Sequence, residues 1–324
     1  MVETNVHYPT DTNLLFDALR KMISLSAKAS KDYALLGWGK SGYHLRQIKR
    51  LFRRTQKVKL STSSDEKKKA TRKKEREKAY RAYLAQAQVL VQRGQETLFK
   101  LQEEIQAPLW VTVDLERFLG HVHRQIDQIQ RRVLLGQTIP HNEKVFSLFQ
   151  PHTEWISKGK AGVPVELGVR TCILEDHYGF ILYHKVMVGQ TDDAVAVPMV
   201  KETKQRFPQL KHCSFDTGFY TPDNQTKLQS LLDLLVLPVK GRPSAQQAAF
   251  EASQECVAAR VKHAAVESAI NALEVHGLDR CPDHGLDGFE RYVALAVVAR
   301  NIQIVGAFLQ KKKIAALKRR KNAA

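Results

Sequence analysis

Cysteine is scarce in this sequence, and it lacks both a long apolar run and a leader-like start. The four cysteines, Cys172, Cys213, Cys256 and Cys281, show no paired spacing among 324 residues. This argues against a disulfide framework and against a zinc site, since the spacing fits neither a ribbon nor a tight finger. No run of eighteen apolar residues exists to span a bilayer, and the first residues lack the pattern of a signal peptide. We therefore expect a cytoplasmic protein with reduced thiols and no membrane partner.

Positive charge, by contrast, is abundant and concentrated. The formal net charge is +18, and residues 46–78 hold fifteen Lys and Arg against four acids. One interpretation is a solvated charge run on surface helices. The other is phosphate binding, because clustered cations supply the sequence-independent part of DNA affinity. The candidate DNA-binding side chains in this segment are Arg53, Arg54, Lys67, Lys68, Lys69, Arg72, Lys73 and Lys74.

The first 142 residues are mostly helical in pattern. Apolar residues recur at three- and four-residue steps, and Thr10 or Asp11 is placed to cap the first helix. The expected elements are a strand over 2–8, and helices that begin near residue 10, span 43–54, run from 65 to 104 and span 111–135. The connection at Pro108 predicts an antiparallel pair of long helices.

From about residue 143 the pattern becomes strand-like, with helices in alternation. Asp176–Gly179 has the composition of a hairpin turn, and Pro198 is tolerable only near the first turn of its helix. The expected strands are 165–175, 180–187, 210–215 and 234–238, and the expected helices are 191–207, 244–273 and 289–309, followed by a basic tail over 311–321. Pattern alone predicts an α/β protein with a helical subdomain.

Two carboxylates stand where metal-dependent chemistry would use them. Asp216 follows a short apolar strand, and Glu267, 51 residues later, lies within a helical pattern. A carboxylate at a strand end and another on a helix beside it can hold a divalent metal, as polynucleotidyl transfer requires. Most acids are solvated surface residues, so this spacing alone does not establish a site.

The sequence motifs around these two acids are more specific than the spacing. Phe215-Asp-Thr-Gly-Phe219, the run from His263 to Cys281, and Pro151-His-Thr-Glu-Trp-Ile-Ser-Lys-Gly-Lys160 closely resemble DDE transposases of bacterial insertion sequences, over residues 2 to about 308. The resemblance implies a ribonuclease H-like mixed sheet flanked by helices, with a long helical insertion after the first strand. The implied organisation is a first-strand remnant (1–11), a basic helical insertion (12–142), a ribonuclease H-like domain (143–310) and a basic tail (311–324).

The resemblance also implies roles for particular residues. Asp216 and Glu267 take the second and third catalytic places and bind Mg²⁺, with Mn²⁺ as a substitute. The first acid is expected upstream of Met1, so the chain is expected to be truncated and inactive, and Glu3 and Asp11 are the nearest substitutes in sequence. The expected partner is double-stranded DNA, at element ends and target, bound by a homo-oligomer. Residues that would contact phosphate near the site are Lys158, Lys160, Arg260 and His263.

Two other functions remain open. A non-enzymatic basic nucleic-acid-binding protein would explain the run of positive charge and the helices, but not the motifs that contain Asp216 and Glu267. A ribonuclease H-like nuclease that hydrolyses without joining strands explains the acids. Lys158 and Lys160 also fit a plain charged loop.

Overall fold

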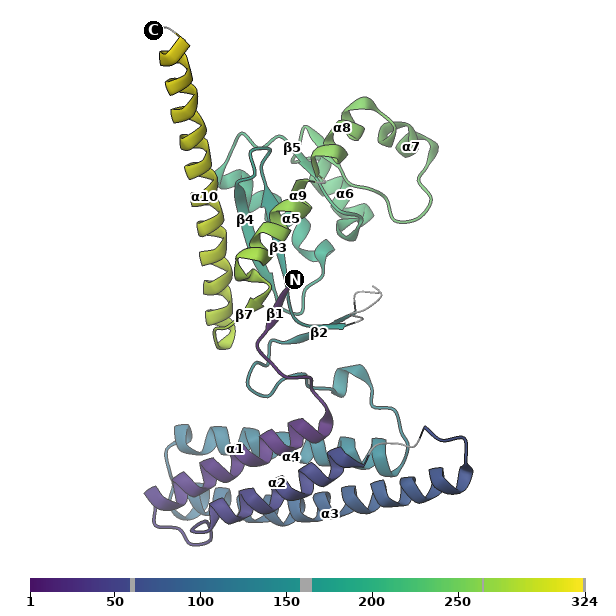
Figure 1. Cartoon of the computed structure of the whole chain (residues 1–324), viewed down its shortest axis with the longest axis vertical. Helices are drawn as coiled ribbons and strands as arrows, with labels where there is room; N and C mark the ends of the chain where they lie inside the picture. The colour runs from purple at the N-terminus through teal and green to yellow at the C-terminus, as the bar shows by residue number, and fades with distance from the viewer. Residues whose placement is uncertain (59–61, 158–164, 264, 323–324) are drawn as a thin grey trace. The chain divides into compact units, whose positions relative to one another are not determined.

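The computed structural model describes residues 1–58, 62–157, 165–263 and 265–322 of a mixed α/β protein (Figure 1). Its contacts divide the chain into two compact units. Residues 7–151 form a helical unit, and residues 1–6 together with 152–324 form an α/β unit. The expected helical insertion, 12–142, falls within the first of these. Lys158 and Lys160 lie outside the described residues.

The described residues of the helical unit, 7–58 and 62–151, form four long helices and three short helical segments. They are α1 (Asp11–Asp32), α2 (Ser41–Lys57), α3 (Glu66–Phe99), η1 (Lys100–Glu104), α4 (Leu109–Ile129), η2 (Gln130–Leu134) and η3 (His141–Glu143). Thr10, not Asp11, caps α1, since its hydroxyl accepts the Asn13 N–H at 3.2 Å. Asp65 caps α3 by accepting the Lys67 and Lys68 N–H groups. The helices predicted from spacing are confirmed, because their apolar periodicity and caps are local signals.

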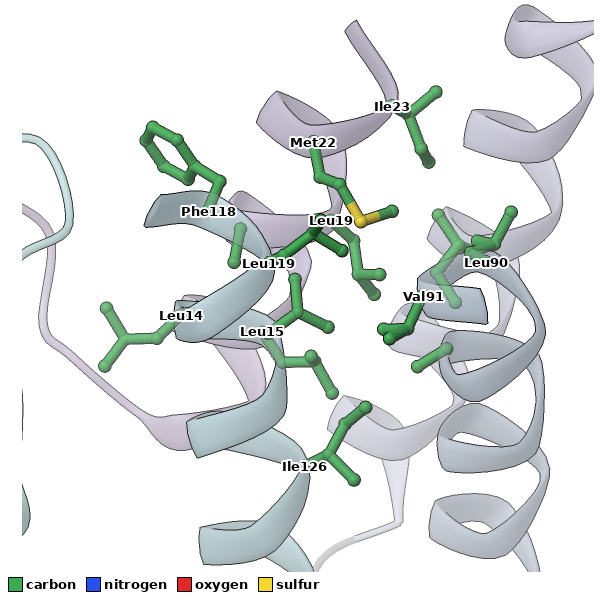
Figure 2. Packing of buried hydrophobic residues seen from close by; sticks show 14 of the residues in the cluster. Leu14, Leu15, Leu19, Met22, Ile23, Leu90, Val91, Phe118, Leu119 and Ile126 are labelled. Carbon is green, nitrogen blue, oxygen red and sulfur yellow. The ribbon is translucent and has the colours of Figure 1, made fainter. Parts of the chain in front are cut away.

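The core of this unit lies where the apolar stripes of α1, α3 and α4 meet (Figure 2). Leu15, Leu19 and Met22 of α1 are fully buried, as their helical spacing predicted. Gly94 of α3 permits a close crossing, because a methyl group there would lie 3.1 Å from both Leu119 and Met22. Packing of this kind, more than intrinsic helix propensity, stabilises the unit.

The α/β unit, in the part of it that the structure describes, contains seven strands in two sheets. They are β1 (Val2–Thr4), β2 (Glu154–Ser157), β3 (Val165–Glu175), β4 (Ile181–Met187), β5 (His212–Ser214), β6 (Leu234–Val236) and β7 (Arg280–Cys281). The larger, mixed sheet has the order β2-β3-β1-β7, with β4 paired to β3, and β5 and β6 form a separate parallel pair. The predicted β3–β4 hairpin is confirmed: the strands are antiparallel, and Gly179 adopts a φ of +90° in the turn.

Strand β1 is shorter than the predicted strand over 2–8. Val2 pairs antiparallel with Val169, and Glu3 and Thr4 pair in parallel with β7. The Val6 N–H donates to the Thr4 carbonyl, which turns the chain out of the sheet. Alternation of side chains predicted the strand, but its end depends on pairing partners that are distant in sequence.

The helices of the α/β unit differ from the prediction in three places. They are α5 (Asp192–Arg206), α6 (Pro222–Gln229), α7 (Ala245–Glu251), α8 (Gln254–His263), α9 (Ala265–Leu273) and α10 (Gly285–Asn322), with the short segments η4 (Thr217–Phe219) and η5 (Glu274–Leu278). The single helix predicted over 244–273 is wrong, since α7 ends before Ser253 and α8 follows it. Pro198 lies in the middle of α5, not in its first turn. The predicted end at 309 is also wrong: α10 continues to Asn322, because its Lys- and Ala-rich end contains no helix breaker.

Two apolar clusters hold the α/β unit together. Val195, Val200 and Phe215 belong to the cluster that joins α5 to β3–β6, and Val169 and Phe289 to the one that joins α10 to the larger sheet. All four cysteines are free thiols, and burial raises the pKa values of Cys172 and Cys213 to about 12.

Candidate functional site

Asp216 is presented to solvent at the end of β5. The preceding Phe215 is buried, and its N–H donates to the Val236 carbonyl at 2.9 Å, which fixes the strand end. Asp216 then begins the turn η4, where its carbonyl accepts the Phe219 N–H at 3.1 Å. Its carboxylate makes no capping bond, and its side chain is 78% exposed. An exposed carboxylate on a fixed strand end is available to a metal or another ligand.

His263 supports this carboxylate from the end of α8. Its Nε2 lies 3.0 Å from Asp216 Oδ1, and its side chain is only 25% exposed. The imidazole therefore orients one carboxylate oxygen and leaves the other free of this contact. The sequence had placed both residues near the site separately, and the structure brings them together.

Gly218 and Asp192 are further members of this site that the sequence reasoning missed. A methyl group on Gly218 would lie 2.9 Å from Asp192 Oδ2, so α5 begins directly against the turn that carries Asp216. Lys240 Nζ donates to the Gly218 carbonyl at 3.4 Å. In the sequence, Asp192 was read only as part of a helix start, and no local signal relates it to a glycine 26 residues later.

Glu267 lies in the first turn of α9 and is exposed. Across residues 1–58, 62–157, 165–263 and 265–322, no group of three or more His, Cys, Asp or Glu side chains is placed to hold a metal ion. Among the residues that the structure describes, oxygen ligands for Mg²⁺ are therefore single carboxylates, and no preformed cluster of three or more ligands surrounds a metal position.

Arg260 is directed to a carboxylate. Its Nη2 lies 3.1 Å from Glu251 Oε2. Burial alone would raise the pKa of Glu251, but hydrogen bonds from Gln247 and Arg260 lower it. Arg260 is therefore partly neutralised, which weakens its expected contact with phosphate.

The His152-Thr-Glu154 stretch has a structural role, since His152 packs against Phe289 and Thr153 bonds to Thr4.

A cluster of cations forms a basic surface on α2 in the helical unit. Six cations recur at steps of three, four or one residue along one face and line a single open pocket of about 450 Å³: Arg46, Lys49, Arg50, Arg53, Arg54 and Lys57. Ile48 and Thr55 on the opposite face are buried in the unit. Within the described chain, no carboxylate pairs with any of the six. We call this surface the α2 basic face.

The lysines at the start of α3 differ, because several have local ion pairs. Lys68 pairs with Asp65, Lys69 with Glu66 and Arg72 with Glu75, each three residues apart. Such exposed pairs contribute at most about 1 kcal/mol each, so the cations stay available to phosphate at a modest cost. The remaining candidates here, Lys67, Lys73 and Lys74, are exposed.

No family model, curated protein or solved structure matches the chain. Function is therefore indicated by the chemistry of two surfaces: the Asp216–His263 site in the α/β unit and the α2 basic face in the helical unit.

The two substitutes considered for a first catalytic acid have other contacts. Asp11 is buried in the helical unit, and its Oδ2 lies 2.9 Å from Arg132 Nη2. Burial raises the pKa of Asp11, while Arg132 and Lys144 oppose that shift. Glu3 belongs to β1, where its N–H donates to the Asp279 carbonyl at 2.8 Å. Asp11 thus has a structural role in the unit that does not contain Asp216.

Proposed function

We propose that this protein belongs to the DDE transposases, which transfer DNA strands with Mg²⁺, and that it has a ribonuclease H-like α/β unit and binds double-stranded DNA. Asp216 and Glu267 are two of the three carboxylates that this class uses, so this chain is expected to bind DNA without transferring strands. The observation that carries the proposal is Asp216: an exposed carboxylate, oriented by a histidine, at the end of a strand within Phe-Asp-Thr-Gly-Phe. The resemblance of the surrounding motifs to insertion-sequence transposases supports the class of reaction. The α2 basic face supports DNA as the class of substrate.

The donor groups fit Mg²⁺ in kind. Mg²⁺ prefers oxygen, keeps several waters, and is usually bound by one or two carboxylates together with substrate phosphates. Asp216 and Glu267 are both exposed carboxylates that would hold it. A bound metal would stabilise the attacking and leaving oxygens of an in-line displacement at phosphorus. His263 would keep the Asp216 carboxylate in one orientation and leave its second oxygen for the ion.

The α2 basic face supports DNA as the substrate. Between Arg46 and Lys57 the helix rises about 16 Å, which matches about five phosphate steps of one DNA strand. Six cations lie along this length, and none of them pairs with a carboxylate among the residues that the structure describes. Each cation that meets a phosphate releases a counterion, and this release drives binding at low salt.

DNA affinity as a function of salt tests the substrate class. Replacing the six cations of the α2 basic face by Gln should flatten the plot of log K against log salt by up to about five units, at about 0.9 per lost phosphate contact. The matched comparison replaces Lys67, Lys68, Lys69, Arg72, Lys73 and Lys74, which removes the same charge from α3. A larger effect from α3 than from α2 would contradict the assignment to α2.

Metal binding tests the site. Calorimetric titration with Mn²⁺ should show weak binding that Asp216→Asn removes. The control is Asp223→Asn, a nearby exposed carboxylate that is paired with Lys227. Equal heats from the wild type and Asp216→Asn would remove Asp216 from the proposed site.

One observation favours a second candidate function. Because no group of three metal-binding side chains is found in the described chain, a DNA-binding protein without catalysis also fits the α2 basic face. Incubation with DNA and Mg²⁺ separates the possibilities. Strand joining supports the transposase class and contradicts the expected inactivity of this chain, nicking without joining indicates a nuclease, and DNA binding without metal binding that depends on Asp216 indicates the non-catalytic protein.

A further inference from the structure

Helix α10 has two apolar faces. Phe289, Val293 and Val297 lie at four-residue steps and are buried in the cluster beneath the larger sheet. A second set, Leu295, Val298, Ile302, Val305 and Leu309, is exposed, with exposed fractions between 45% and 66%. Figure 1 shows the later half of α10 continuing past the ends of the sheet strands. We call the second set the α10 stripe.

The α10 stripe has the spacing of a helix-pairing seam. Its residues follow one another at steps of three, four, three and four. At 3.6 residues per turn they fall within an arc of about 80°, centred about 160° from the buried residues. Steps of three and four that repeat every seven residues are the pattern by which two helices pack side by side. The helix is therefore built to pack on two opposite sides, and the sheet accounts for one.

A membrane is the alternative occupant. The segment Gly285–Arg319 is long and apolar enough to cross a bilayer by length and composition. However, the Asn301 side chain accepts the Ile181 N–H at 2.9 Å and donates to the Ile181 carbonyl at 3.0 Å. Together with the buried side chains of Phe289 and Val293, these two hydrogen bonds hold α10 on β4. Insertion into a bilayer would uncover that sheet face and leave these backbone groups unpaired, at a large cost.

We propose that the α10 stripe binds the same stripe of a second copy of this protein, with the two helices antiparallel. Leu295 and Leu309 lie seven residues before and after Ile302, so an antiparallel pair centred on Ile302 brings each of them to the other on the second copy, as a twofold interface does. Charge favours the antiparallel arrangement. Asp287 and Glu290 are exposed before the stripe, and Lys312 and Lys313 are exposed after it. Antiparallel helices bring these acids toward the other copy's lysines, whereas parallel helices place lysines beside lysines.

Sedimentation of the full chain tests the pairing. The wild type should be a dimer, and Ile302→Glu should weaken the dimer at least tenfold, because it places two charges at the centre of the seam. Gln310→Glu adds the same charge on the exposed surface outside the stripe and should leave the dimer unchanged. Circular dichroism of both variants confirms that they are folded. A monomeric wild type, or a dimer that Ile302→Glu does not weaken, overturns the proposal.

Cysteine crosslinking tests the direction, in a Cys213→Ser background because the other three cysteines are buried. Ile302→Cys should crosslink with itself upon oxidation. Leu309→Cys should not crosslink with itself but should crosslink with Leu295→Cys when the two variants are mixed. Self-crosslinking of Leu309→Cys would indicate parallel helices and overturn the antiparallel arrangement. Binding of the wild type to phosphatidylcholine–phosphatidylglycerol vesicles, lost in Ile302→Glu, would overturn the pairing in favour of a membrane.

Discussion

At the scale of single residues, a missing side chain sets the closest approach in the larger sheet. Gly168 of β3 faces β1, and a methyl group there would overlap the Val2 carbonyl oxygen. Backbone atoms cannot move aside as the end of a flexible side chain can. Only glycine allows β1 and β3 to pair at this point.

We expect Gly168→Ala to destabilise the α/β unit by about 1–3 kcal/mol, as overpacking of a well-packed region does. Gly306→Ala is the matched control, since that position is open and lies within helix α10. It should be neutral or stabilising by up to about 1 kcal/mol. Urea denaturation of both variants measures the difference, and a neutral Gly168→Ala would show that β1 is not held in this register.

His152 gives the α/β unit a dependence on pH. Burial lowers the pKa of His152 from its usual 6.5, so the folded chain binds this proton less readily than the unfolded chain. The contribution of neutral His152 to the stability of the α/β unit is therefore complete above about pH 6.5, and it is lost as the pH falls toward the lowered pKa of the folded chain. The pKa of His184 is lowered in the same direction, first by burial and then by Arg206.

We expect the melting temperature of the wild type to fall between pH 7.5 and pH 5.5, and His152→Gln to lessen that fall. Calorimetry at the two pH values measures it. His276→Gln, an exposed histidine, is the control and should show the wild-type fall. An identical fall in His152→Gln and the wild type would show that His152 titrates alike in the folded and unfolded chains.

The sequence predicted part of the site at this scale. Asp216 and His263 were both candidates because their residue types and surrounding words suggested metal and phosphate chemistry. Their 3.0 Å contact, and the position of Asp192 against Gly218, depend on how α5, α8 and β5 pack. Packing between elements distant in sequence leaves no local signal.

At the scale of elements, α5 contains an irregularity. Pro198 lies inside the helix, where it has no N–H to donate to the Ala194 carbonyl. An interior proline costs a helix about 3 kcal/mol or more, although its rigidity also restricts the unfolded chain. The Pro198 side chain is exposed, so replacing it removes little packing.

Pro198→Ala should therefore stabilise the α/β unit by about 2 kcal/mol, the helix gain less the roughly 0.4–1 kcal/mol that the more flexible unfolded chain recovers. Lys201→Ala, at an exposed position one turn later, should change stability by less than about 0.5 kcal/mol. Chemical denaturation compares the two. Destabilisation by Pro198→Ala would mean that the proline ring makes contacts that outweigh the missing hydrogen bond.

Helices and strands differed in how well the sequence predicted them. The helices α1–α4 carry their own periodicity and caps, so their positions followed from local pattern. The short strand β7 was not predicted, because two residues have no periodicity and are defined only by pairing with β1. The separation of β5 and β6 from the larger sheet likewise depends on long-range pairing.

At the scale of the whole molecule, each unit has its own core. Leu19 is fully buried in the helical unit, and Phe289 is almost fully buried in the α/β unit. A unit with its own core can unfold by itself. Stability is then a property of each unit.

We expect Leu19→Ala to lower the stability of the helical unit by about 2–5 kcal/mol and Phe289→Ala to lower that of the α/β unit by about 3–5 kcal/mol. Hydrogen exchange with mass spectrometry, which reports each segment separately, should show faster exchange only in the unit that carries the substitution. Equal acceleration in both units would show that they unfold as one.

The pairing of β1 also determines the order in which the two units can finish folding while the chain is being synthesised. Val2 pairs with Val169, and Glu3 also pairs with Arg280, whereas the helical unit is complete within residues 7–151. The ribosome adds about 5–20 residues each second, and contacts between near neighbours in sequence form fastest. The helical unit can therefore fold while β1 still has no partner. Residues 2–4 therefore leave the ribosome before the helical unit but reach their native pairing after it.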